Sequence, residues 1–306
     1  MATRLSDIGN LSLAGSSEIF NAAMKQNIDM YWKPICREVQ EEKQIGNYDT
    51  VGDLGPAAYH VEEDPITFDG ISYDNRTYIT SRVVSKGVKV TMEANIFDQY
   101  NEIKKQFGKP LTVVMNDFKE VLVADVYNDA FATVGVDGKA QIANDHPLSG
   151  SALVNDNLVT GALTPANYKA GKLRFEFLYT QAGRHFPTHP THLLIHPGMQ
   201  YVAYEMLNSA LMAFELSNTK NSLQALQPTK LLMNPYLDYN TTTDVSPWFL
   251  LDKSIDDAGV VLQKKQGLKL RNWFENAELT LKGVAYEVYG CGMVAPGYGI
   301  VGSVGS

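Results

Sequence analysis

The clearest periodic pattern in this chain lies between residues 111 and 134. Apolar side chains recur there at spacings of three and four residues, as they do on one face of an amphipathic helix. The pattern predicts a long helix that buries this stripe against a sheet, starting after Gly108-Lys109-Pro110, with residues 97–107 as a separate helix before it. The stripe consists of Leu111, Val114, Met115, Phe118, Leu122, Tyr127 and Phe131.

Alternation of apolar and polar residues predicts strands in two other places. Residues 65–92 alternate over two runs with Asp69-Gly70, Asp74-Asn75 and Lys86-Gly87 as turn signals, which indicates a two-stranded ribbon. An isolated ribbon is marginally stable in water, so neighbouring protein has to support it. A long strand is predicted from Glu278 to Gly290. The glycine-rich tail after it is either a flexible end or closely packed backbone.

The N-terminal region has little core of its own. A serine cap with Glu18 in the first turn predicts a helix from Ser16, which Pro34 breaks or kinks. Residues 46–64 offer few periodic apolar positions and have glycines beside acids, which favours an extended arm. Such an arm needs a partner surface.

The second half of the chain alternates turns, strands and helices. Asp137-Gly138 predicts a hairpin turn and residues 140–143 a short strand, which Asn144 to Pro147 end. Thr164-Pro165 is a helix start that favours a helix toward Thr180. The other predicted elements are a strand at 192–196, a helix from Pro197-Gly198 to about 216, a polar loop with one helical turn at 217–230, and strands at 231–239 and 248–252.

Composition is that of a globular chain with a large core. Of the 306 residues, 44% are hydrophobic, and we find no apolar run long enough to span a bilayer and no secretory signal. We therefore expect a soluble protein made in the cytosol, with Cys36 and Cys291 as reduced thiols. The net charge of −8 without a block of Lys or Arg disfavours tight, direct DNA binding.

Candidate catalytic and metal-binding residues are few. His185, His189, His192 and His196 are spaced four, three and four residues apart, which invites a metal site. Pro187 and Pro190 forbid a regular helix there, so structural histidines are the favoured interpretation. No nucleophile elbow and no phosphate loop is present. The sequence thus predicts neither an enzyme nor a cofactor.

Several short segments in colinear order carry a resemblance to a known family. They are Asp137-Gly138, His146-Pro147-Leu148, Leu163-Thr164, the strand and helix at 193–209, Trp248-Phe249-Leu250 and the glycine-rich tail. The segments are spread over about two thirds of the chain, and their order carries more weight than any one of them. With these segments in this order, the chain resembles the major capsid (head) proteins of tailed bacteriophages, most of all the Mu-like head-subunit group.

The resemblance implies an α+β fold, the tailed-phage major capsid fold. Its parts are an N-terminal arm, an extended β-hairpin loop, a peripheral domain with a long spine helix, and an axial domain with a central sheet. Mapped onto this chain, the N-terminal helix and arm take 1–64, the hairpin loop 65–92, the peripheral domain with its spine helix 93–144, the axial domain 145–256, and the return strands and tail 257–306.

The implied function is self-assembly into an icosahedral head that encloses double-stranded DNA without sequence-specific binding. Implied partners are further copies as pentamers and hexamers, together with scaffolding, portal and decoration proteins, and no membrane. The location is the virion capsid, after synthesis in the host cytoplasm. The residues we expect at contacts between subunits are Tyr48, Asp53 and Tyr59 on the arm, and Asp69, Tyr73, Arg76, Arg82 and Lys86 on the ribbon.

Three alternatives stay open at this point. Some members of the wider fold join a lysine to a neighbour's asparagine, for which Lys86 and Lys89 are candidates here. An encapsulin would use the same fold to enclose a cargo enzyme. A metal-dependent hydrolase rests only on the histidines from His185 to His196. Little sequence precedes the first helix, which leaves two options open: a separate scaffolding protein, which the initial Met1 favours, or a chain that is already mature.

Overall fold

The computed structural model describes residues 30–51, 54–55, 57, 59–60, 62, 65–66, 68, 73–97, 102–186, 188–210, 220–226, 229–241, 246–255 and 259–305. The helix expected from Ser16 lies outside these residues. Residues 33–35, around Pro34, form a turn ahead of β1 (Arg37–Gln40).

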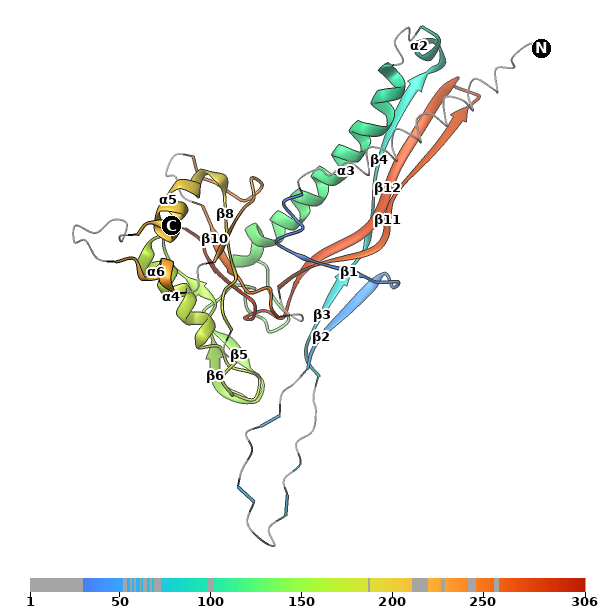
Figure 1. Cartoon of the computed structure of the whole chain (residues 1–306). Helices are drawn as coiled ribbons and strands as arrows, with labels where there is room; N and C mark the ends of the chain where they lie inside the picture. Colours follow the sequence, from blue (N-terminus) through green and yellow to red (C-terminus); the bar gives the residue numbers. More distant parts are fainter. Residues whose placement is uncertain are drawn as a thin grey trace.

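A long, mainly antiparallel sheet and one long helix form an elongated part of the molecule (Figure 1). The sheet has the order β1-β11-β12-β4, with β1 parallel to β11. Side chains of β12 alternate between buried and half-buried, and the buried ones, such as Ala285, face the helix. The bounds are β11 (Gly259–Glu275), β12 (Thr280–Val294) and β4 (Arg82–Thr91), followed by the short α2 (Met92–Ile96).

The long helix α3 (Glu102–Asn128) starts earlier than expected and is one helix rather than two. It continues through Pro110, although an internal proline removes a hydrogen bond and typically costs about 3 kcal/mol. Burial of Leu111 and Met115 against Ala285 just beyond the proline offsets that cost. The expected stripe is only partly right: Tyr127 is buried as well, but Val114 and Phe118 are 44% and 47% exposed.

The ribbon pairs differently from the expectation. The strand β3 (Tyr73–Thr80) pairs with β2 (Ile45–Val51), which comes from the expected arm. The strand β4 pairs with β12 along its whole length instead of turning back on β3. Ser81, which is buried between β3 and β4, is where the chain passes from the ribbon to the sheet. The pairing expected within 65–92 is therefore wrong, and the domain division drawn from it stays a prediction.

A second, five-stranded sheet lies beside the C-terminal end of α3 (Figure 1). Its order is β7-β13-β10-β8-β9, and the last described residues of the chain, from the glycine-rich tail, fill a place inside it. The tail is thus closely packed backbone: Gly302 leaves no room for a side chain beside Ile142 and Phe249. The strands are β7 (Leu158–Val159), β8 (His192–Ile195), β9 (Lys230–Met233), β10 (Trp248–Leu251) and β13 (Ile300–Ser303).

The helices around this sheet start where the sequence signals predict, but the helix expected to reach about residue 216 ends at Asn208, because the backbone of Ser209 is extended. Thr164 caps α4 (Pro165–Glu176) by accepting a hydrogen bond from the backbone N–H of Asn167. The strand expected at 231–239 ends at Met233 because Asn234 is fully buried and Pro235 follows it. The remaining elements are η1 (Asp129–Phe131), η2 (Pro197–Met199), α5 (Gln200–Asn208), α6 (Ser222–Ala225), and the hairpin of β5 (His146–Leu148) and β6 (Ser151–Asn155).

One hydrophobic core joins the two sheets. Tyr127 near the end of α3 contacts Phe249 of β10 edge-on, with ring centroids 5.2 Å apart, and its hydroxyl donates to the carbonyl of Ile35 at 2.5 Å. The turn at Asp137-Gly138 is confirmed, since Gly138 has a φ of 79°. The strand expected at 140–143 is wrong; only a single bridge joins Ala140 to Val134.

Candidate assembly surfaces

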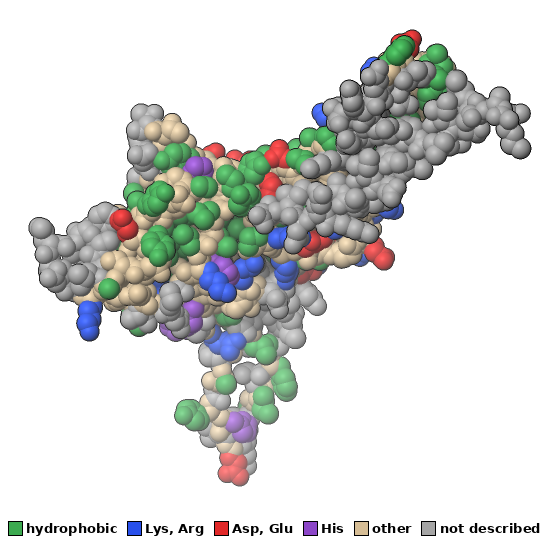
Figure 2. Space-filling model, turned by 45° about the horizontal axis from the view of Figure 1, so that its top comes forward, with side chains coloured by type: hydrophobic (Ala, Val, Ile, Leu, Met, Phe, Trp, Pro, Cys, Tyr) green, Lys and Arg blue, Asp and Glu red, His purple; other side chains and the backbone are tan. Residues whose placement is uncertain are grey.

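The ribbon of β2 and β3 projects from the body of the molecule and carries exposed apolar side chains (Figures 1 and 2). Four of them lie on the segment between the two strands. Tyr59 is 102% exposed, Phe68 90%, Ile66 64% and Leu54 48%. Apolar groups gathered on a segment without a core of its own are typical of an interaction surface.

Two charged side chains on the ribbon, Arg76 and Asp49, pair with each other. Arg76 and Asp49 are cross-strand partners, and the guanidinium of Arg76 donates from Nε to Oδ1 at 2.5 Å and from Nη2 to Oδ2 at 2.9 Å. The hydrogen bond that Arg76 donates to Asp49 raises the pKa of Arg76 further above its usual value, so the group is charged throughout the accessible pH range. This bidentate pair fixes the strand register at a position expected to contact another subunit.

Tyr48 ties the ribbon to the long sheet. Its ring packs with Ile79 and Val261, and its hydroxyl donates to Oε1 of Gln263 at 3.4 Å. Burial raises the pKa of Tyr48 above its usual value. Tyr48 therefore has a role inside the chain, whatever it contacts in an assembly.

The other expected contact residues do not form one cluster. Tyr59 is fully exposed beyond the ribbon strands, whereas Arg82 and Lys86 are exposed on β4 of the long sheet, as is Lys89. The backbone of Tyr73 starts β3, opposite Val51. Asp53 and Asp69 lie outside the described residues. As subunit contacts, all eight residues stay predictions.

A groove of about 750 Å³ at the root of the ribbon was not expected from the sequence. Its exposed apolar lining comes from separate parts of the chain: Tyr78 is 59% exposed, Val83 68%, Phe118 47%, Val134 66% and Val136 42%. No single periodic pattern contains these positions, so only the fold brings them together. Of these residues, the sequence pattern includes only Phe118, and it predicts that Phe118 belongs to the buried stripe of the long helix.

Three of the four histidines from His185 to His196 make separate contacts, and the fourth, His189, is exposed. The ring of His185 lies 4.7 Å from that of Tyr179, and Nδ1 of His192 lies 2.8 Å from the hydroxyl of Thr191. His196 accepts from the N–H of Gly198 and stacks on Tyr239 at 4.4 Å. Burial lowers the pKa of His192 and of His196. Among the described residues, no three His, Cys, Asp or Glu side chains are grouped as a metal site.

The two thiols are held as neutral packing groups. Cys36 and Cys291 are free, and burial raises the pKa of both, to about 12 for Cys291. Thiolate chemistry at neutral pH is therefore disfavoured. None of the helices in the described part of the chain is both long enough and apolar enough to cross a membrane.

No family model and no curated protein matches this chain. Several solved structures are similar to it. The match to the capsid of cyanophage Pam1 covers 91% of this chain and 92% of the cyanophage chain, with a TM-score of 0.56 and 13% sequence identity. The capsid of cyanophage P-SCSP1u covers 88% and 85% at a TM-score of 0.56 and 12% identity.

An encapsulin is similar to the same degree. The SrpI encapsulin of Synechococcus elongatus covers 91% of this chain and 88% of its own, with a TM-score of 0.55 and 13% identity. These likenesses establish the fold: the chain has the mixed α+β tailed-phage major capsid fold, as its sequence predicts.

Proposed function

We propose that this chain is the major capsid protein of a tailed phage, which assembles as pentamers and hexamers into an icosahedral head around double-stranded DNA. The observation that carries the proposal is the exposed Tyr59, Ile66 and Phe68 on the segment that joins the two ribbon strands, in a fold shared with capsid proteins. Apolar groups exposed to this extent are stabilised when neighbouring subunits cover them.

The role is structural rather than catalytic. Scaffolding, portal and decoration proteins are further proposed partners, and the virion capsid is the proposed location after synthesis in the host cytoplasm. DNA is enclosed without specific binding, in keeping with the net charge of −8. The narrower likeness to Mu-like head subunits and a lysine cross-link at Lys86 or Lys89 stay predictions.

An encapsulin-like shell is the second candidate, because the similarity to the SrpI encapsulin equals that to the cyanophage capsids. Protein cargo in place of nucleic acid in purified particles would favour it. The metal-dependent hydrolase has no comparable support, since His192 and His196 contact other groups and no three potential metal ligands gather among the described residues.

The test is a pair of ribbon variants compared by sedimentation. Tyr59→Ser combined with Phe68→Ser removes the two most exposed apolar side chains, and Tyr59→Phe combined with Phe68→Leu is the matched control that keeps them apolar. We expect the serine variant to stay as unassembled, folded subunits and the control to form large particles. Particles of normal size and yield from the serine variant would contradict the proposal.

A further inference from the structure

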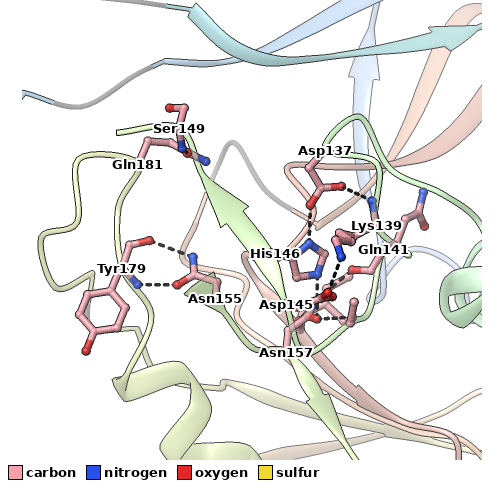
Figure 3. A network of polar contacts seen from close by, with 12 residues as sticks. Asp137, Lys139, Gln141, Asp145, His146, Ser149, Asn155, Asn157, Tyr179 and Gln181 are labelled. Atoms are coloured by element: carbon pink, nitrogen blue, oxygen red, sulfur yellow. Dashed lines mark hydrogen bonds and ion pairs between the residues drawn. The ribbon is translucent and has the colours of Figure 1, made fainter. Parts of the chain in front are cut away.

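Figure 3 shows a buried polar network around His146, at the junction between the turn after α3 and the second sheet. Asp137 lies in that turn, His146 begins β5 and Asn157 precedes β7. The side chains of His146 and Asp137 are only 3% and 4% exposed, and Asn157 is 1% exposed. No substrate reaches this pair, so it is not a catalytic dyad.

The backbone fixes the orientation of the Asn157 amide. Its Nδ2 donates to the carbonyls of Gln141 at 3.0 Å and Ile300 at 3.2 Å. Its Oδ1 accepts from the backbone N–H of Ala143 at 2.8 Å. A backbone N–H only donates and a carbonyl only accepts, so oxygen and nitrogen cannot be exchanged here.

This orientation fixes the protons on His146. Nε2 of the ring lies 3.1 Å from Oδ1 of Asn157, which accepts only, so Nε2 carries a hydrogen. Nδ1 lies 2.5 Å from Oδ2 of Asp137, a contact that also needs a hydrogen between the two atoms. A neutral imidazole supplies one hydrogen. The pair therefore holds one proton more than a neutral histidine beside a carboxylate.

The other charged groups nearby are already engaged. Oδ1 of Asp137 accepts from the backbone N–H of Lys139, and the side chain of Lys139 forms an ion pair with Asp145. From the other sides, Gly297 packs against the ring without a charge, and Asp156 next to Asn157 pairs with Arg174. Among the described residues, Asp137 is the carboxylate that contacts the ring.

We propose that Asp137 and His146 form a proton-dependent clasp, which holds the turn after α3 against β5 and β13 and loosens as the pH rises. The sign follows from linkage. An unfolded histidine loses its proton near pH 6.5, at about its ordinary value. The clasp needs the hydrogen between Nδ1 of His146 and Oδ2 of Asp137, so its contribution is complete at low pH and is lost when that hydrogen is removed at high pH. Once the proton is lost, one hydrogen remains on the ring for two contacts. Either Nδ1 of His146 then faces Oδ2 of Asp137 as a second acceptor, or the hydrogen bond from Nε2 to Oδ1 of Asn157 is broken.

Hydrogen–deuterium exchange of the full chain at pH 6 and pH 8.5, after correction for intrinsic exchange, tests this proposal. In the wild type, amides at 134–157 should open more readily at the higher pH, by up to about tenfold per pH unit for one proton. The helix α4, whose hydrogen bonds do not involve the clasp, is the internal control. Equal protection of 134–157 at both pH values, relative to α4, would overturn the proposal.

Two variants separate the clasp from general stability. In Asp137→Asn, the new amide donates to Nδ1 of a neutral ring, so both bonds persist without the extra proton, and the pH dependence at 134–157 should disappear. His146→Gln removes the titrating ring itself and should also be insensitive to pH. A pH dependence in both variants equal to that of the wild type would place the titrating group elsewhere. If neither variant folds, the contrast between 134–157 and α4 in the wild type still decides.

Discussion

Replacing Lys119 with methionine should destabilise the folded subunit by removing half of a buried ion pair. Nζ of Lys119 on α3 lies 2.9 Å from Oε1 of Glu287 on β12, and the two side chains are 8% and 2% exposed. The ammonium also lies over the rings of Trp32 and Tyr289, 5.4 Å and 5.2 Å from their centroids. This one group therefore connects α3, the long sheet and the turn before β1.

The magnitude follows from what the substitution leaves behind. Lys119→Met leaves the carboxylate of Glu287 buried without its partner, and its Oε2 has no hydrogen bond among the described residues. Breaking such a pair typically costs about 3–5 kcal/mol, whereas replacing both partners by apolar residues is often close to neutral. We expect Lys119→Met combined with Glu287→Leu to recover most of the loss, with a coupling energy of about 2–4 kcal/mol.

Urea unfolding of unassembled subunits, followed by tryptophan fluorescence, measures these differences. The matched control is Lys264→Met, which breaks the exposed pair of Lys264 with Glu38 and should cost at most about 1 kcal/mol. A loss below about 1 kcal/mol for Lys119→Met, or no recovery in the double variant, would refute the reasoning. Either result would mean that water reaches the pair despite its burial.

Three further substitutions test other parts of the fold by urea or thermal unfolding. Burial raises the pKa of Glu120 to about 7, against the opposing hydrogen bonds from the backbone of Trp32 and Tyr31. Because the unfolded carboxyl ionises near pH 4.3, the burial penalty is absent below that pH and complete above about 7. Glu120→Gln should therefore raise the free energy of unfolding by about 1–3 kcal/mol at pH 8 and change it little at pH 4. An equal gain at both pH values would contradict this pH dependence. Gly302→Val should lower the free energy of unfolding by about 1–3 kcal/mol, because a Cβ at this position would lie 2.6 Å from Cδ1 of Ile142. Unchanged stability would show that the packing around β13 is loose. Thr164→Ala should cost about 1 kcal/mol through loss of the α4 cap, and Thr164→Ser should not.

Local signals in the sequence predicted individual elements well. The spine-helix pattern, the Thr164 cap and the Asp137-Gly138 turn all lie where residue chemistry within a few positions decides the structure. The continuation of α3 through Pro110 was missed because burial against a distant strand, β12, offsets the local penalty. Helix propensity alone contains no information about that strand.

Strand pairing was harder to predict than strand position. Residues 65–92 contain two strands, as expected, but alternation does not say which partner each strand takes. The true partners lie before and far after them, at 45–51 and 280–294. The groove at the root of the ribbon was missed for the same reason, since Phe118, Val83 and Val136 meet only in the folded chain.

The Asp137–His146–Asn157 network could be predicted only in part from the sequence. All three residues lie between positions 137 and 157, a region in which the sequence predicts turns. The fixed amide of Asn157 depends on the carbonyl of Ile300, far along the chain, so the protonation argument needs the structure.

Negative-stain electron microscopy of the purified full chain, with its sedimentation profile, tests the central claim most directly. The account predicts closed shells of uniform size, or rings of five and six subunits, for the chain alone or with its scaffolding protein. A folded monomer or small dimer under both conditions would contradict it.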